Sequence, residues 1–329
     1  MKRKMVSSLL ALCMMMLLLP MTAFAQAQTV DSQEALKDAV TAGGEITLGT
    51  DIVLTEGLEI PEGKTVTLNL NGCTLSYSAA DTISNKGTLT IAGAGSVVNT
   101  GNGGALVNYP GAVANLTGGI FQGNKWYTIK NLGTMIISGE AAVTTADAEG
   151  KSSLIANGWY GNGTSNDCKV PYPVDGTPAS LTIEKGTFNG GMNTVKNDDY
   201  GKLEISGGTF SNTNGPAVMN WNEASISGGE FTAPNGVVLS NGYLDGTADK
   251  GVMTVTGGTF TSGNGGTDPL FGYNEGAGKG GSVSLSNVTV NAVVSTYENV
   301  YDVSVSSGTF SSAVPAACIA SDKTSASLT

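Results

Sequence analysis

Residues 203–210 read Leu203-Glu-Ile205-Ser-Gly-Gly-Thr209-Phe210. Two apolar residues separated by one polar residue are the period-two signature of a strand with one buried face. The glycines after Ile205 permit a sharp bend, after which Thr209 and Phe210 begin a second short strand with Phe210 facing inward. One phrase therefore predicts two strands joined by a corner.

The same phrase recurs along the chain. Closely spaced copies lie 20 to 24 residues apart, and a fixed period in this range indicates a solenoid in which each coil rests on the one before it. Copies with the aromatic residue end at Phe121, Phe188, Phe210, Phe231, Phe260 and Phe310, and looser copies end at Leu75, Val97, Val143 and Val290.

Each unit also carries an apolar residue shortly before an asparagine. If each unit is one coil, these asparagines stack in a column, where their side-chain amides bond one another and tolerate turn geometry. We expect this column to be a structural ladder rather than a catalytic feature. Its members are Asn85, Asn108, Asn131, Asn157, Asn197, Asn220 and Asn241.

Three short strands per turn predict an all-β chain, a right-handed single-stranded parallel β-helix of about 10–12 coils. An exposed first coil would be a template for aggregation, so it needs a cover. Asp31-Ser32-Gln33-Glu34 resembles a capping box, and Leu36, Ala39 and Val40 share one face of a short helix. We expect an N-terminal cap at 26–50, the β-helix at 51–310 with a loop insertion around 144–180, and a polar tail at 311–329 whose end is truncated or left open.

The first 25 residues have the pattern of a secretory signal peptide, with Lys2-Arg3-Lys4, an apolar run over 9–19 and the ending Ala23-Phe24-Ala25. Removing them takes the formal net charge from −11 to −14, which excludes nucleic acid as a partner because that binding needs a basic patch. No later stretch is long and apolar enough to span a bilayer. We expect a secreted or cell-surface chain, with no membrane insertion after signal cleavage.

The motifs Ile205-Ser-Gly-Gly-Thr-Phe210, Ile226-Ser-Gly-Gly-Glu-Phe231 and Val255-Thr-Gly-Gly-Thr-Phe260 carry a resemblance. With them the chain resembles the pectate-lyase-like right-handed parallel β-helix repeat proteins secreted by Gram-positive gut bacteria. The likeness spans nearly the whole predicted mature chain and is specific for the fold. It implies little about activity, because such helices host lyases, hydrolases, adhesins and plain spacers.

The resemblance also frames an enzymatic alternative. Pectate lyases of this fold typically use an Arg base and Ca²⁺ held by carboxylates, and polygalacturonases use paired aspartates with a nearby His. This chain has no His, and its one Arg, Arg3, lies in the predicted leader. A minority of the lyases use Lys, so the catalytic candidates are Lys196, Asp198 and Asp199. Adjacent aspartates on a strand point to opposite faces, but on a loop Asp167, Asp198 and Asp199 are weak Ca²⁺ candidates.

Aromatic residues follow the ladder asparagines by one to three positions. In a regular coil such positions fall along one edge of the rod, where exposed rings suit sugar rings or the side chains of a partner. Alternatively, the rings only cover the turns below them. A column of outward threonines of the ice-binding kind is another alternative, and it is interrupted at Ile120 and Glu230. The predicted ligand-binding residues are Tyr109, Trp159, Tyr160, Tyr200, Trp221 and Tyr243.

The sequence thus predicts a secreted or cell-surface β-helix that acts as a binding, adhesion or structural module toward glycans or a surface protein, without a cofactor. The alternative is a carbohydrate-active enzyme, a metal-assisted polysaccharide lyase or hydrolase that uses Lys196.

Overall fold

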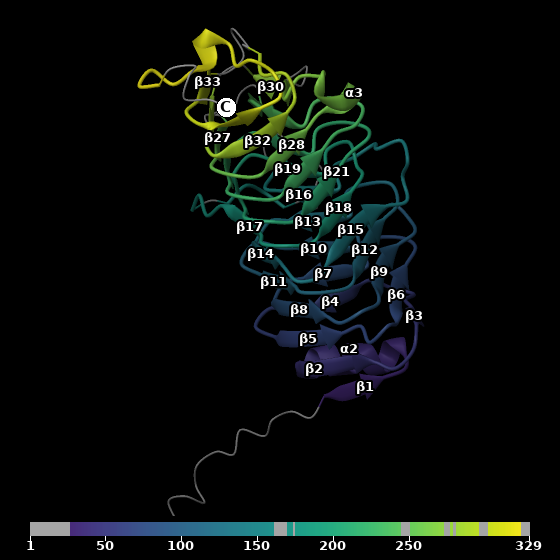
Figure 1. Ribbon diagram of the computed structural model, residues 1–329. Helices are drawn as coiled ribbons and strands as arrows, with labels where there is room; N and C mark the ends of the chain where they lie inside the picture. The colour runs from purple at the N-terminus through teal and green to yellow at the C-terminus, as the bar shows by residue number, and fades with distance from the viewer. Residues whose placement is uncertain are drawn as a thin grey trace, which may run out of the picture.

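The computed structural model describes residues 27–160, 170–173, 175–244, 251–272, 277–278, 281–295 and 302–323. In this part the chain is all-β and winds through about ten stacked parallel coils, as the β-helix prediction requires. Figure 1 shows the coils stacked from β1 at the N-terminal end to β33 near the C-terminus. The predicted signal peptide at 1–25 lies outside the described residues.

Each coil contributes strands to three parallel sheets within the described residues. Sheet A contains β1 (Gln28–Val30), β2 (Gly44–Leu48), β5 (Thr65–Asn69), β8 (Thr88–Ala92), β11 (Val113–Leu116), β14 (Thr134–Ile137), β17 (Ala179–Ile183), β20 (Gly201–Ile205), β23 (Glu223–Ile226), β27 (Val252–Val255), β31 (Ser282–Leu285) and β33 (Asp302–Val305). Sheet B contains β3 (Ile52–Val53), β6 (Thr74–Tyr77), β9 (Ser96–Asn99), β12 (Ile120–Gly123), β15 (Ala142–Thr145), β18 (Thr187–Asn189), β21 (Thr209–Ser211), β24 (Glu230–Thr232), β28 (Thr259–Thr261), β32 (Val288–Asn291) and β34 (Gly308–Phe310). Sheet C contains β4 (Leu58–Ile60), β7 (Ile83–Asn85), β10 (Leu106–Asn108), β13 (Ile129–Asn131), β16 (Ile155–Asn157), β19 (Val195–Asn197), β22 (Val218–Asn220), β25 (Leu239–Asn241) and β29 (Phe271–Gly272).

Successive copies of the phrase lie in register. Leu203 pairs with Ala224 in sheet A, and Phe210 pairs with Phe231 in sheet B. Between these strands the chain turns at Gly208, whose φ of 104° is one that side chains with a Cβ rarely adopt. The phenylalanine therefore faces the interior in every stacked copy, and neighbouring rings lie parallel with centroids 4.6 Å apart for Phe188 and Phe210 and for Phe210 and Phe231.

A helix covers the first coil. α2 (Gln33–Ala42) begins after Ser32, whose hydroxyl accepts a hydrogen bond from the Ala35 N–H at 3.2 Å. Leu36, Ala39 and Val40 are its buried residues, the face that the sequence predicts. The helix therefore shields the interior of the coil that would otherwise be open at this end.

The structure adds detail to two of the predicted segments. The loop insertion expected around 144–180 contains β16, which pairs in parallel with β13 on one side and β19 on the other, so part of this segment is a regular coil. The expected polar tail packs back on the last coil, because Val305 bridges to Ile319 and Cys318 in the short 3-10 helix η1 (Ala316–Cys318) is buried.

The remaining elements are minor. α3 (Gly263–Gly266) is a single turn, and β26 (Tyr243–Leu244) forms an antiparallel pair with β30 (Ala277–Gly278). Among the residues that the structure describes, no helix is both long and apolar enough to cross a membrane.

Candidate functional site

The outer face of sheet C carries the candidate site. Each sheet C strand is three residues long or close to it, and its first and last residues face inward, so the middle residue faces outward. Register aligns these middle residues in a column that includes Lys130, Ala156, Lys196 and Met219. The ladder asparagines are the last residues of the same strands. Each donates its amide to the next across 2.7–2.9 Å, from Asn85 to Asn241.

A cleft of about 830 Å³ lies over this column, and we call it the sheet C cleft. Its floor is formed by Ala156, Lys196 and Met219. Because the strands are parallel, the turns that enter them form one wall and the turns that leave them form the other. The entering wall includes Asp81, Gly103, Trp126, Ser153 and Asn193, and the leaving wall includes Tyr109, Tyr160 and Trp221.

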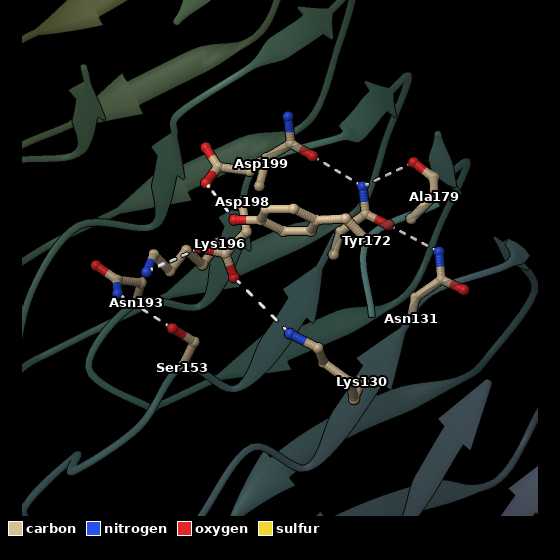
Figure 2. A network of polar contacts seen from close by, with 11 residues as sticks. Lys130, Asn131, Ser153, Tyr172, Ala179, Asn193, Lys196, Asp198 and Asp199 are labelled. Carbon is tan, nitrogen blue, oxygen red and sulfur yellow. Dashed lines mark hydrogen bonds and ion pairs between the residues drawn. The ribbon is translucent and has the colours of Figure 1, made fainter. Parts of the chain in front are cut away.

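Lys130, Lys196 and Asp198 converge in a buried charged group (Figure 2), of which Lys196 and Asp198 line the cleft. The Lys196 Nζ lies 2.8 Å from the Asp198 Oδ1, and the Lys130 Nζ lies 4.0 Å from the Asp198 Oδ2. The Lys130 side chain is fully buried, and that of Lys196 is 11% exposed. The Lys196 contact is an ion pair without the alignment of a hydrogen bond, which leaves Asp198 Oδ1 without a hydrogen-bond partner. One carboxylate therefore lies within ion-pair distance of two ammonium groups.

Two aromatic rings also contact the Lys196 ammonium group. Its Nζ lies 3.6 Å from the centroid of the Trp221 ring and 4.3 Å from that of Tyr160. The two rings are stacked on each other, with centroids 5.8 Å apart. A cation over a ring face is attracted by the ring quadrupole, so these rings hold the lysine in place.

The predicted row of exposed rings is only partly present. Trp159 and Trp221 are buried, so the expectation that they are exposed is wrong. Trp159 packs with Leu132 and Ala179 and makes an edge contact with Tyr200, because the chain after Asn157 folds back to pair with Asp199. Trp159 and Tyr200 therefore belong to packing, which is the alternative that the sequence left open.

Of the other predicted site residues, some line the cleft and others lie outside the described part of the chain. Tyr109 and Tyr160 line the cleft, and Tyr160 is 44% exposed. The Tyr243 side chain and all of Asp167 lie outside the described residues.

The two adjacent aspartates diverge. Asp198 faces the two lysines, whereas the Asp199 Oδ2 accepts a hydrogen bond from the Tyr172 hydroxyl at 3.2 Å. Tyr200 follows them with a φ of 56°, a left-handed conformation that allows this tight turn. Among the described residues, no three carboxylate, thiol or imidazole groups lie close enough together to hold a metal ion. The arrangement brings Lys196 and Asp198 together but does not give Asp198 and Asp199 a common ligand position.

Several residues that line the cleft were not predicted from the sequence. Trp126 is 53% exposed at the rim, and Met192 is exposed as well. Asp81 accepts a hydrogen bond from the Gly104 N–H at 2.8 Å, and burial raises the pKa of its carboxyl although that N–H opposes the shift. These residues lie in turns before strands, where no periodic pattern marks them. Lys130 could have been identified as a candidate from the sequence, because Ile129-Lys-Asn131 repeats the pattern of Val195-Lys-Asn197.

No protein-family model, curated protein or solved structure matches this chain. The sheet C cleft is therefore the feature of this chain that bears most on function.

Proposed function

We propose that this protein binds glycans in the sheet C cleft and acts as a non-catalytic binding module outside the cell. The observation that carries the proposal is the exposed indole of Trp126 at the rim of the cleft. A sugar ring presents a face of C–H groups, and a flat aromatic ring can cover that face and remove it from water while the hydroxyls reach polar groups nearby. The export that the leader pattern predicts is consistent with this role.

The exposed apolar side chains support the same location. Large apolar side chains exposed among the described residues are Val53, Ile120, Trp126, Tyr160, Met192 and Val252. Trp126, Tyr160 and Met192 all line the sheet C cleft. Apolar groups that gather in a concave, partly polar surface mark a ligand site more often than scattered ones do.

The length of the cleft favours a chain of sugars over a single one. Its lining extends from Asp81, before β7, to Trp221, after β22. Each coil adds about 4.8 Å along the rod, so the five steps between these strands span roughly 24 Å. The β-sheet scaffold holds this surface in one shape, which reduces the ordering cost of binding.

The enzymatic alternative has one observation in its favour. Lys130, Lys196 and Asp198 form a buried charged group at the cleft, and active sites concentrate such groups. However, Asp198 and two ring faces enclose the Lys196 ammonium, and only 11% of its side chain is exposed. Lys196 is therefore better suited to shape the cleft floor than to accept a proton from a substrate.

A glycan array followed by calorimetry tests the proposal. We expect wild-type protein to bind at least one class of oligosaccharide, and Trp126→Ala to weaken that binding by about tenfold, because the aromatic face that covers the sugar ring is lost. Ile120→Ala is the matched control, because Ile120 is 47% exposed on β12 of sheet B and does not line the cleft. Absence of any bound glycan, or equal losses in both variants, would contradict the proposal.

The alternative is tested separately with acidic polysaccharides and Ca²⁺. We expect no unsaturated products from the purified protein. Products that form with wild type and disappear with Lys196→Ala would replace the binding proposal by a lyase.

A further inference from the structure

Asn193 lines the sheet C cleft and holds a buried acceptor atom. Its side chain is 2% exposed, and its Nδ2 donates to the Ser153 Oγ at 3.2 Å. Its Oδ1 is buried and has no hydrogen-bond partner. A buried carbonyl oxygen without a donor costs free energy, so a ligand hydroxyl or amide N–H that reached it would recover that cost.

The lysines that line the cleft are already engaged. Lys196 is paired with Asp198 and covered by Trp221 and Tyr160. Lys151 is paired with Glu149 at 2.7 Å. Lys125 is exposed on the turn beside Trp126 but does not line the cleft. A ligand carboxylate would therefore have to compete with Asp198 for Lys196 and with Glu149 for Lys151, whose side chain is 58% exposed.

Asp81 adds a negative charge to the entering wall. One of its oxygens accepts the Gly104 N–H, and the carboxyl is partly withdrawn from water. A second carboxylate brought into this wall would be repelled, and repulsion is stronger where water screens less. The formal net charge of −11 for the whole chain acts in the same direction at longer range.

We propose that the sheet C cleft selects uncharged, hydroxyl-rich glycans over glycans that carry uronate groups. This inference rests on the proposed function and names its ligand class. Hydroxyls or acetamido N–H groups of the ligand donate to Asn193 Oδ1 and to Asp81, and Trp126 covers a sugar face.

Matched probes test the selection. Two trisaccharides that differ only in a terminal glucose or glucuronate residue are titrated by calorimetry at 0.15 M salt. We expect the glucose probe to bind about tenfold more tightly or better, and we expect high salt to narrow the difference because it screens the repulsion. Equal or tighter binding of the glucuronate probe would overturn the selection while leaving glycan binding intact. If neither probe nor any array glycan binds, the proposed function itself fails.

Asp81→Asn isolates the charge. It keeps an oxygen for the Gly104 N–H and removes the negative charge, so we expect it to strengthen glucuronate binding severalfold relative to glucose binding. Asp51→Asn is the control, because Asp51 also accepts a backbone N–H, that of Thr74 at 2.7 Å, but lies away from the cleft. An unchanged preference in Asp81→Asn would contradict the assigned role of Asp81.

Asn193→Ala isolates the acceptor. We expect it to weaken binding of the glucose probe by about tenfold, as loss of a buried hydrogen bond to a ligand does. Asn212→Ala, which removes another buried asparagine side chain that does not line the cleft, should change binding by less than about threefold. Equal effects of the two variants would show that Asn193 acts through packing and would overturn its role as a ligand acceptor.

Discussion

Phe210 shows how one side chain joins three coils. Its ring is fully buried and lies between Phe188 and Phe231, with both centroid distances at 4.6 Å and interplanar angles of 12° and 6°. The register of sheet B holds the rings in this parallel stack, at a centroid distance within the range that aromatic pairs favour. The ring also contributes through the apolar area it buries.

We expect Phe210→Ala to lower the free energy of unfolding by about 3–5 kcal/mol, because it leaves a cavity between rings that the sheet holds apart. Urea denaturation measures this change. Thr209→Ala is the control, since Thr209 faces solvent on the same strand and its loss should cost less than about 0.5 kcal/mol. A near-zero effect of Phe210→Ala would show that the ring is not enclosed.

Sheet C is held by side chains as well as by its backbone. The ladder asparagines are almost fully buried, and each amide serves its neighbours in both directions. A member in the middle of the ladder has two asparagine partners, whereas Asn241 accepts from Asn220 and donates to backbone oxygens of Gly251 and Ser282. Position in the column should therefore decide the cost of a substitution.

We expect Asn157→Ala to cost about 2–4 kcal/mol, because it leaves the Asn131 amide without one acceptor and the Asn197 oxygen without one donor in a buried site. Asn241→Ala should cost roughly half as much. Thermal or urea unfolding of the two variants compares them. Equal costs at both positions would mean that the chain of side-chain bonds adds nothing beyond local contacts.

Elements with a periodic pattern were predictable, and the turns between them were not. The strands that contain Ile205 and Phe210 were predictable because buried and exposed positions alternate along them. The ladder position of Asn157 predicted a coil inside the segment expected to be a loop insertion, and β16 ends at that residue. Trp126 and Asp81 lie in turns, where position depends on how neighbouring coils stack. Trp159 is buried because the chain after β16 returns to pair with Asp199, a long-range contact that no local pattern encodes.

In the whole molecule, the stacking of coils brings residues that are far apart in the sequence close together. Asp81 and Trp221 are 140 positions apart, yet both line one cleft because five coil steps separate them in space. In a solenoid each coil contacts its neighbours only, so coils beyond this region can change with little effect on the cleft. The Gly-Gly turns lie at another corner of the rod, between sheets A and B. They serve as an internal control for ligand binding in the cleft.

Hydrogen exchange followed by mass spectrometry, with and without the best glycan ligand, tests most directly whether the cleft is the binding surface. We predict slower exchange in the entering turns at 102–104, 126–128 and 192–194, where ligand contact should reduce opening. Exchange at 207–209 and 228–230, in the Gly-Gly turns, should stay unchanged. Protection confined to the Gly-Gly turns, with none at the entering turns of sheet C, would show that the cleft is not the binding surface.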